Sequence, residues 1–198
     1  YISIRAQVPN QEFLMNRQYT VTEGTEEYFR ISVKREDDVN PNGVVSNFLH
    51  ASEVGTNVQV SAPAGVFTLL QNDAPVLFIS GGVGVTPLQA MLKTMENRKA
   101  SFIQCARNER VAAFKETIEQ QVAALGGTYK AVYSDTEGYV TKEQIAASLE
   151  EGTEVYVCGP IAFMETVISS LVELNVPADK IHYEFFGAAM ALQIKKTA

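Results

Sequence analysis

The pattern of hydrophobic and polar positions changes near residue 74. In the first third of the chain, apolar residues stand at every second position over 2–8 and 29–33. This period of two predicts half-buried antiparallel strands. A further strand is expected over 57–62, and Ser46 is expected to be the N-cap of a short helix. From residue 74 on, apolar runs of five or six residues alternate with amphipathic stretches of ten or more, which is typical of a parallel sheet covered by helices on both faces.

The second region divides into strands and helices. Five strands are expected, at 75–80, 101–106, 128–134, 154–158 and 181–185. Two amphipathic helices are expected, at 111–125 and 161–174. Pro160 suits the first turn of the second of these helices. The polar segment 70–74 is the expected linker, so we place the domains at 1–72 and 73–198; a length of 198 residues allows two small domains, since a typical domain has about 150 residues.

Composition and charge exclude several classes of protein. The chain has 16 basic and 23 acidic residues and no basic run, so its net charge of −7 argues against a nucleic-acid partner. Its apolar stretches are too short to cross a membrane. Two cysteines, Cys105 and Cys158, cannot build a disulfide framework and favour a cytoplasmic location. His50 and His182 are too isolated to suggest a metal site, so we expect any redox cofactor to be organic.

A glycine-rich turn, SGGVGVTP at 80–87, directly follows the first of the five strands and precedes a helix. Glycines allow the backbone to approach a pyrophosphate, and the free N–H groups at the start of the helix face it. Pro87 stands where the usual dinucleotide fingerprint would close on the helix with its third glycine, so the motif departs from that fingerprint. The alternative is a strand-to-helix turn whose glycines serve its geometry alone.

The tripeptide CGP at 158–160 repeats this arrangement after the fourth strand. Gly159 permits close approach, and Pro160 opens the next helix without losing a needed donor. Doubly wound sheets bind ligands beyond the carboxyl ends of their strands, where the strand order reverses. If the strand order is 3-2-1-4-5, the two loops are neighbours at this crevice. The alternative for Cys158 is a small buried hydrophobic residue.

The tetrapeptide RQYT at 17–20 combines a cation, an aromatic ring and a hydroxyl on an expected strand. Alternation sends Arg17 and Tyr19 to one face and Gln18 and Thr20 to the other. One strand can therefore clamp a phosphate and stack on a ring. A solvated arginine beside a core tyrosine explains the same four residues.

A second candidate phosphate cradle is GVVSN at 43–47. Gly43 precedes a helix start whose N–H groups, with the Ser46 hydroxyl, can bind an anion. Simple helix capping explains Ser46 equally well.

Eight segments of the chain are in the order found in one known family. They are RQYT (17–20), SVKRE (32–36), GVVSNFLH (43–50), APAGVF (62–67), SGGVGVTP (80–87), CARNE (105–109), YVCGPIAFM (156–164) and IHYEFFG (181–187). Together they resemble the ferredoxin–NADP reductase superfamily, and most closely the reductase half of bacterial flavohaemoglobins, which act as nitric oxide dioxygenases. The resemblance spans nearly the whole chain. It implies a fold of class α/β plus β, with an N-terminally incomplete antiparallel flavin-binding barrel (1–72) and a five-stranded parallel, doubly wound NAD(P)-binding domain (73–198).

The resemblance also implies cofactors and site residues. The cofactors are FAD and either NADH or NADPH, with a hydride passing from the nicotinamide to flavin N5. The residues implied to bind or cover the flavin are Tyr1, Arg17, Gln18, Tyr19, Thr20, Gly43, Val44, Val45, Ser46, Phe185, Phe186, Gly187 and Ala188. Those implied to bind the nicotinamide nucleotide are Gly81, Gly82, Val83, Gly84, Val85, Thr86, Cys158 and Gly159. The implied catalytic residues are Tyr19, Thr20, Cys158 and Glu184, of which Thr20 and Glu184 accept or relay a proton near N5.

The chain departs from the family at two places. It reads FGAAMAL where the family continues FG into Pro and His, so the cap at 188–190 is expected to be looser. The family's barrel begins about two strands before the segment that matches Tyr1, and the chain opens without an initiator methionine or targeting signal. We therefore expect a fragment that starts within a longer protein and whose FAD affinity is compromised if the upstream strands are absent.

The function implied is an NAD(P)H-oxidising FAD reductase module of a flavohaemoglobin-like nitric oxide dioxygenase. Its partner is an electron acceptor domain, covalently linked or separate, and most simply the haem of a globin. The alternatives are a reductase for another acceptor, such as an oxygenase or a ferredoxin, and a truncated nucleotide-binding module without turnover. The resemblance favours NADH, although Arg107 and Arg110 after the second parallel strand can bind a 2′-phosphate or be ordinary surface arginines.

Overall fold

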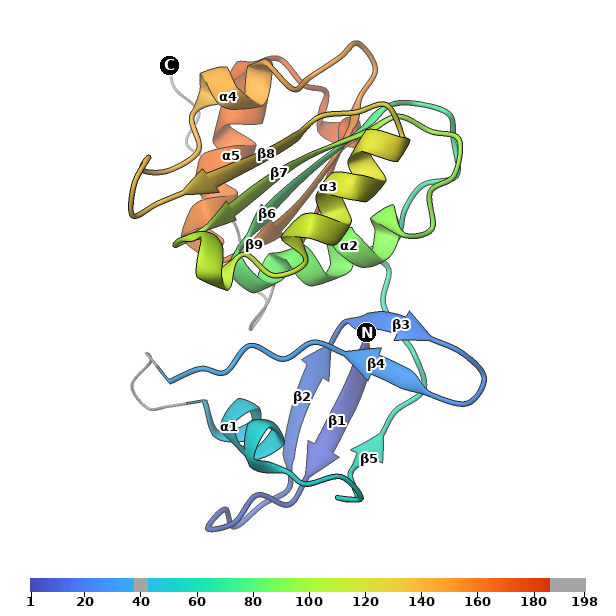
Figure 1. Cartoon of the computed structure of the whole chain (residues 1–198), viewed down its shortest axis with the longest axis vertical. Coiled ribbons are helices and arrows are strands. Elements are labelled where there is room, and N and C mark those ends of the chain that lie inside the picture. The colour runs from blue at the N-terminus through green and yellow to red at the C-terminus, as the bar shows by residue number, and fades with distance from the viewer. Residues whose placement is uncertain (38–42, 186–198) are drawn as a thin grey trace. The chain divides into compact units, whose positions relative to one another are not determined.

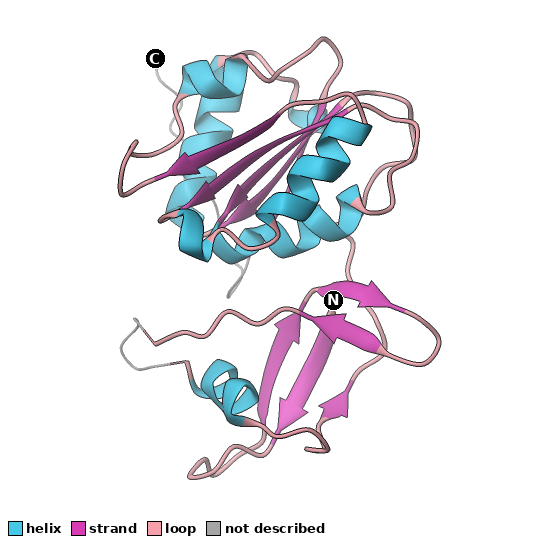
Figure 2. Cartoon of the chain, viewed as in Figure 1, coloured by secondary structure: helices cyan, strands magenta, loops and turns pink. Residues whose placement is uncertain are grey.

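The computed structural model describes residues 1–37 and 43–185, which form two compact units (Figure 2). The first unit is Tyr1–Val66, and the second begins at Phe67. The expected division between residues 72 and 73 lies later than this one. The reason is that the Phe67 ring packs 6.0 Å from the ring of Tyr156, and the Leu70 N–H donates a hydrogen bond to the Tyr156 hydroxyl (2.9 Å). Tertiary contacts therefore assign this polar stretch to the second unit.

Antiparallel strands and one helix make up the first unit (Figures 1 and 2). The strands are β1 (Ile2–Ala6), β2 (Met15–Tyr19), β3 (Val21–Gly24), β4 (Phe29–Ile31) and β5 (Gln59–Val60), and the helix is α1 (Val44–Ala51). One sheet has the order β2-β1-β5, and β3 pairs with β4 in a separate hairpin. The apolar face predicted for residues 2–8 is confirmed, because Ile2, Ile4, Ala6 and Val8 are all buried.

Two expectations for the first unit are wrong. The predicted strand over 29–33 ends at Ile31, and Phe29 is 46% exposed; β4 pairs with β3 in a two-stranded hairpin. The predicted strand over 57–62 shortens to β5. Beyond β5 the chain still follows β1, with a hydrogen bond from Ser61 N to Ser3 O (3.0 Å), but Pro63 has no N–H to continue a ladder.

The helix α1 begins earlier than the sequence indicates. Its N-cap is Gly43, and Ser46 lies inside the first turn, where its hydroxyl donates to the Gly43 carbonyl (3.1 Å). The same hydroxyl accepts the N–H of Glu36 (3.3 Å). Ser46 therefore ties the helix start to the preceding loop instead of capping the helix.

A five-stranded parallel sheet forms the second unit. Its strands are β6 (Val76–Gly81), β7 (Ala100–Ala106), β8 (Tyr129–Tyr133), β9 (Glu154–Gly159) and β10 (Ile181–Phe185). The sheet order is β10-β9-β6-β7-β8, which confirms the expected 3-2-1-4-5 arrangement when read from its other edge. The helices are α2 (Val85–Leu92), α3 (Lys115–Ala124), α4 (Lys142–Ala146) and α5 (Ile161–Glu173), with short 3-10 turns at Gly82–Gly84, Glu109–Val111 and Ala178–Lys180. Figure 1 shows α2 and α3 on one face of the sheet and α4 and α5 on the other.

Each face of this sheet has its own hydrophobic core. On the α2/α3 face the fully buried rings of Phe78, Phe102 and Tyr156 pack together. The other face carries α5, the amphipathic helix predicted at 161–174, whose buried residues are Met164, Val167, Ile168 and Leu171. Burial on both faces is the reason why these strands read as continuous apolar runs.

Two helix starts in the second unit differ from the prediction. Pro160 occupies the N-cap of α5, one position before its first helical residue. The helix expected from residue 111 begins only at Lys115, because Phe114 adopts a left-handed conformation (φ 63°) that interrupts it.

Candidate functional site

The turn after β6 and the loop after β9 meet at the carboxyl edge of the parallel sheet. A methyl group placed on Gly84 would overlap the carbonyl oxygen of Cys158 and lie 2.7 Å from the nitrogen of Gly159. Only a residue without a side chain allows this approach, since backbone atoms cannot turn aside. The two loops that the sequence singled out separately therefore meet in direct backbone contact, and we call this place the loop junction.

An aromatic ring that the sequence did not single out, that of Phe163, packs at the loop junction. A Cβ on Gly81 would lie 2.8 Å from Cδ1 of Phe163, and one on Gly159 would lie 2.6 Å from the same atom. Phe163 belongs to the first turn of α5 and packs against both glycine positions. The available signal was its place in the segment CGPIAF, four residues after Gly159.

The turn at 82–84 presents backbone to the surface. Gly82 is exposed, has φ +54°, and would have open space around an added Cβ. Val85 and Thr86 are buried instead, and the Thr86 hydroxyl donates to the Val83 carbonyl (3.0 Å), which holds the turn. The N–H of Val85, the first residue of α2, donates to the carbonyls of Gly82 and Val83, so the 3-10 turn continues into the helix start, which carries the positive end of the helix dipole. The turn therefore offers backbone donors to an anion, and its side chains serve as support.

The end of β10 brings two more of the predicted residues to this edge. In the parallel register, Glu184 stands beside Cys158 and Phe185 stands beside Gly159. Burial raises the pKa of the Glu184 carboxyl, so it keeps its proton to a higher pH than an exposed glutamate does. The predicted residues Phe186, Gly187 and Ala188, and the cap at 188–190, lie outside the described residues.

The side chain of Cys158 is fully buried, and burial, followed by the charge of Glu184, raises the pKa of its thiol. Burial also raises the pKa of the Cys105 thiol, to about 12. A thiol reacts as its thiolate, which forms only as the pH approaches the pKa.

We predict that the native protein at pH 8 does not react with a thiol reagent such as dithionitrobenzoate, because a pKa of about 12 leaves a thiolate fraction of roughly 10⁻⁴. Two thiols per chain should become reactive after unfolding in guanidinium. Rapid labelling of Cys158 in the folded protein, located by peptide mapping, would contradict this picture and give that residue a nucleophilic character.

Three of the predicted flavin-binding residues, Tyr19, Val44 and Val45, belong to one hydrophobic cluster. Tyr19 is half-buried and packs with Val44 against Ala6, Val8 and Val45. Burial raises the pKa of the Tyr19 phenol, so this ring stays neutral. The structure therefore brings the start of α1 beside the end of β2.

Register along β2 sets the faces of the RQYT residues. Tyr19 stands opposite Ile2, Arg17 opposite Ile4, and Gln18 opposite Ser3. The predicted separation of Arg17 and Tyr19 from Gln18 is confirmed. Arg17 is exposed, and its guanidinium donates to the Asn16 carbonyl (2.7 Å). Thr20 follows the end of β2.

Two more of the predicted flavin-binding residues, Val45 and Tyr1, differ in what they can offer a ligand. Val45 is 2% exposed, so only its backbone is available to a ligand at the start of α1. The ring of Tyr1 lies against Gly65, where a Cβ would be 3.2 Å from Cδ1 of the tyrosine. An apolar cavity of about 550 Å³ in the same unit is lined by Ile2, Ile4, Phe29, Ile31 and Val60, among others, and by none of the predicted flavin-binding residues.

Within residues 1–37 and 43–185, no group of three or more potential metal ligands is present. None of the helices in this part of the chain combines the length and the apolar character needed to cross a bilayer.

Known proteins share both this sequence and this fold. A family model described as an oxidoreductase NAD-binding domain matches residues 78–168. A solved structure of the flavohaem-like FAD/NAD-binding domain of nitric oxide dioxygenase from Vibrio cholerae is 33% identical, with a TM-score of 0.84, and the match covers 94% of this chain and 84% of that one. The chain belongs to the flavohaemoglobin reductase-domain family. This confirms the predicted superfamily, the predicted fold class and the expectation of an NAD(P)H-dependent flavin oxidoreductase.

Longer flavohaemoglobins contain a matching segment. The flavohemoprotein of Bacillus cereus is 37% identical over 98% of this chain and 54% of the relative. A flavohemoglobin from Malassezia yamatoensis, solved with FAD and haem, is 27% identical, with a TM-score of 0.78, over 93% of this chain and 50% of that one. The chain of this reductase-domain family member thus spans about half the length of the curated relatives that it matches.

Proposed function

We propose that this chain is the reductase module of a nitric oxide dioxygenase, in which NADH delivers a hydride to FAD and single electrons pass on to a globin haem. The observation that carries the proposal is the contact of Gly84 with the Cys158 carbonyl, because it brings the loops after β6 and β9 together at the point where the strand order reverses. This is where doubly wound sheets bind nucleotides.

The residues present fit a nicotinamide nucleotide. Gly82 leaves open space beside the N-terminus of α2, so a pyrophosphate can approach the backbone donors of the turn formed by Gly81 to Thr86. Cys158 and Gly159 are the residues that we assign to the nicotinamide end of the site. The thiol of Cys158 is buried and uncharged, so it does not compete as a nucleophile.

The first unit fits a flavin dinucleotide. Arg17 is an exposed guanidinium that can hold a pyrophosphate as a two-pronged donor, and the N–H groups of Val44, Val45 and Ser46 supply further donors at the start of α1, whereas the Gly43 N–H already donates to the Glu36 carbonyl (2.8 Å). Tyr19 and Tyr1 offer aromatic faces for the flavin rings. FAD, when bound, accepts two electrons as a hydride and releases them singly.

Proton handling falls to two side chains of this set. Glu184 keeps its proton to a raised pH because it is half-buried, so it can donate and recover a proton beside the reacting ring. The hydroxyl of Thr20, at the end of β2, is the second group that we assign to this task. Phe185, the last described residue of β10, is the side chain that we assign to shielding the site from water.

The acceptor, the coenzyme preference and the location belong to the same proposal. A haem in a globin domain is the acceptor that accounts for the flavohemoprotein relatives. NADH is the proposed coenzyme, and Arg107 and Arg110, which follow β7, are the positions at which NADPH would be accepted. The cytoplasm is the proposed compartment, because the chain carries two unpaired cysteines.

Anaerobic titration tests the proposal. The flavin-loaded protein should lose its visible flavin absorbance on addition of one equivalent of NADH and should then reduce ferricyanide. Persistent oxidised absorbance with excess NADH and NADPH would reject the proposal. NADH binding without any bound flavin would favour a nucleotide-binding module without turnover. Bleaching without electron transfer to an added globin would point to another acceptor.

A further inference from the structure

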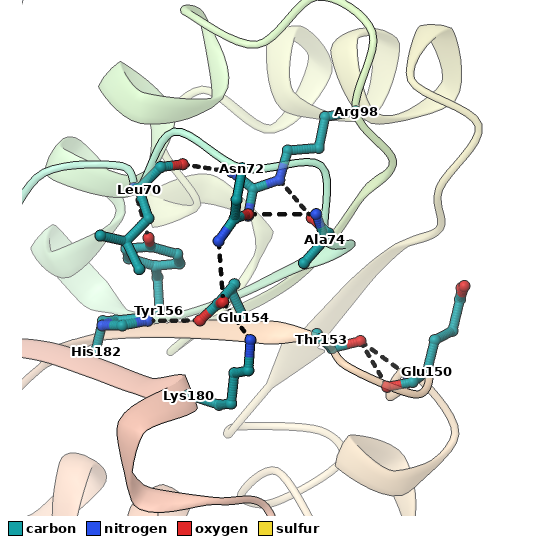
Figure 3. A network of polar contacts seen from close by, with 10 residues as sticks. All are labelled: Leu70, Asn72, Ala74, Arg98, Glu150, Thr153, Glu154, Tyr156, Lys180 and His182. Atoms are coloured by element: carbon teal, nitrogen blue, oxygen red, sulfur yellow. Dashed lines mark hydrogen bonds and ion pairs between the residues drawn. The ribbon is translucent and has the colours of Figure 1, made fainter.

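The segment 67–75, which connects the first unit to β6, is bound to the sheet through its backbone (Figure 3). The Leu70 N–H donates to the Tyr156 hydroxyl (2.9 Å). The Arg98 guanidinium donates to the carbonyl oxygens of both Leu70 (2.7 Å, from Nη1) and Ala74. We call residues 67–75 the connecting segment.

A buried carboxylate, Glu154, ties a side chain of the connecting segment to two strands of the sheet. Only 3% of its side chain is exposed. Its Oε1 accepts hydrogen bonds from Asn72 Nδ2 (3.1 Å) and Lys180 Nζ (2.6 Å), and its Oε2 lies 2.8 Å from His182 Nε2. Figure 3 shows these groups converging on the start of β9.

This carboxylate is ionised although it is buried. Burial alone would raise the pKa of Glu154, but the hydrogen bonds from His182, Lys180 and Asn72 outweigh it, so the pKa lies below the ordinary glutamate value. A buried ionic cluster of this kind adds little net stability compared with apolar packing. We therefore look for a role of this cluster other than stabilising the fold.

The cluster lies at the amino end of the sheet, opposite to the loop junction of Gly84 and Cys158. Glu154 is the first residue of β9, whereas Cys158 and Gly159 are the last two. None of the residues around Glu154 is among those assigned to the nucleotide or the flavin. Its partner Asn72 lies in the connecting segment, so the cluster acts on the chain that joins the two units.

We infer that Glu154, Asn72, Tyr156 and Arg98 form a latch that fixes where the connecting segment enters the nucleotide-binding sheet, and thereby positions the flavin-binding unit for hydride transfer. The inference rests on the proposed function. Hydride transfer requires two rings to stay in near contact, and small displacements caused by distant mutations can lower such a rate by about 100-fold. A segment held at both ends and at its backbone restricts that displacement.

The test uses Asn72→Ala in the flavin-loaded protein, because this change removes the hydrogen bond to Glu154 and leaves Lys180 and His182 in place. It also removes the acceptor of the Ala74 N–H (3.3 Å), so the exchange of the other amides of the segment is the readout that reports on Glu154. Amide hydrogen exchange of the peptide covering 67–75 should accelerate about 10-fold or more. The limiting rate of anaerobic flavin reduction at saturating NADH should fall about 10-fold, while the apparent dissociation constant of NADH stays within twofold.

Two control variants separate positioning from simple loss of stability. Gln71→Ala removes an exposed neighbour in the same segment whose side chain reaches only the Leu69 carbonyl, and it should change neither readout. Ile145→Val shortens a fully buried side chain on the other face of the sheet. It should lower Tm by about 2–4 °C, as we expect for Asn72→Ala, without slowing flavin reduction.

The outcomes are distinct. Faster exchange in Asn72→Ala with an unchanged reduction rate would overturn the positioning role, and unchanged exchange would overturn the latch itself. A reduction rate that falls equally in Ile145→Val would assign the effect to stability and also refute the inference. Failure of NADH to reduce the wild-type flavin would reject the proposed function instead, and the exchange measurement reports on the latch without any flavin chemistry.

Discussion

Gly84→Ala is expected to abolish productive binding of NADH. The added methyl group would overlap the Cys158 carbonyl oxygen and lie 2.7 Å from the Gly159 nitrogen, so the two loops must separate. Both partners are backbone atoms at the end of a buried strand, which cannot give way as a flexible side chain does. We expect the rate of flavin reduction by NADH to fall about 100-fold or more, and the free energy of unfolding to drop by about 1–3 kcal/mol. Stopped-flow reduction and thermal unfolding measure the two effects.

Two further glycine variants are controls: they show whether an effect of Gly84→Ala comes from its position or from backbone strain or lost stability in general. Gly138→Ala places a methyl group where the backbone has φ +81° but open space surrounds it, so it introduces backbone strain alone. Gly127→Ala introduces an overlap with the Ala100 carbonyl, at the opposite end of the sheet. Gly127→Ala should destabilise the protein at least as much as Gly84→Ala and leave the folded fraction able to bind NADH. If the flavin of Gly84→Ala were reduced by NADH at the wild-type rate, the loop junction would not be the nucleotide site.

Arg17→Ala is expected to weaken FAD binding by about 10- to 100-fold. Hydrogen bonds to a charged group contribute about 1.5–3 kcal/mol, and Arg17 is the only cation of the RQYT motif. Because Arg17 is exposed and bonds only to a neighbouring carbonyl in its strand, the stability of the flavin-free protein should change little. Titration of the flavin-free variant with FAD, followed by quenching of flavin fluorescence, gives the dissociation constant.

Arg5→Ala is the matched control for this prediction. Arg5 is an exposed arginine on the neighbouring strand β1. Arg17 stands opposite Ile4, and Arg5 follows Ile4 directly, so alternation puts Arg5 and Arg17 on opposite faces of the sheet. Both variants lose one positive charge from the same sheet. Equal weakening of FAD binding by the two would mean that general charge, and not a specific contact at Arg17, attracts the flavin. Arg17→Lys should fall between wild type and Arg17→Ala, since it keeps the charge and loses the planar fork.

Local periodicity was a good guide to the elements of this protein. The alternation over residues 2–8 predicted the buried face of β1, and the apolar runs predicted all five parallel strands. Both signals are set by which side chains must leave water, and each can be read from neighbouring residues. The same reasoning failed at Phe29, because alternation indicates a strand but not whether anything covers its apolar face.

Boundaries and caps were less predictable. Ser46 is a good N-cap residue by type, but its hydroxyl bonds to Gly43 and Glu36, so the helix begins earlier. Phe114 takes a left-handed conformation for which its residue type gives no warning. Local preferences amount to about 1 kcal/mol, and tertiary contacts readily override them.

The sequence by itself determined the class of fold, the order of its elements and the two glycine-containing loops that make a nucleotide site plausible. Only the tertiary structure decided that Gly84 touches the Cys158 carbonyl, that Phe163 packs against both glycine positions, and that Asn72, Lys180 and His182 share the carboxylate of Glu154. Periodicity and motifs arise from interactions between residues close in the chain. Apart from the contact of Phe163 with Gly159, these contacts join residues tens of positions apart, and they exist only because sheet order and register bring particular atoms within a few ångströms of one another.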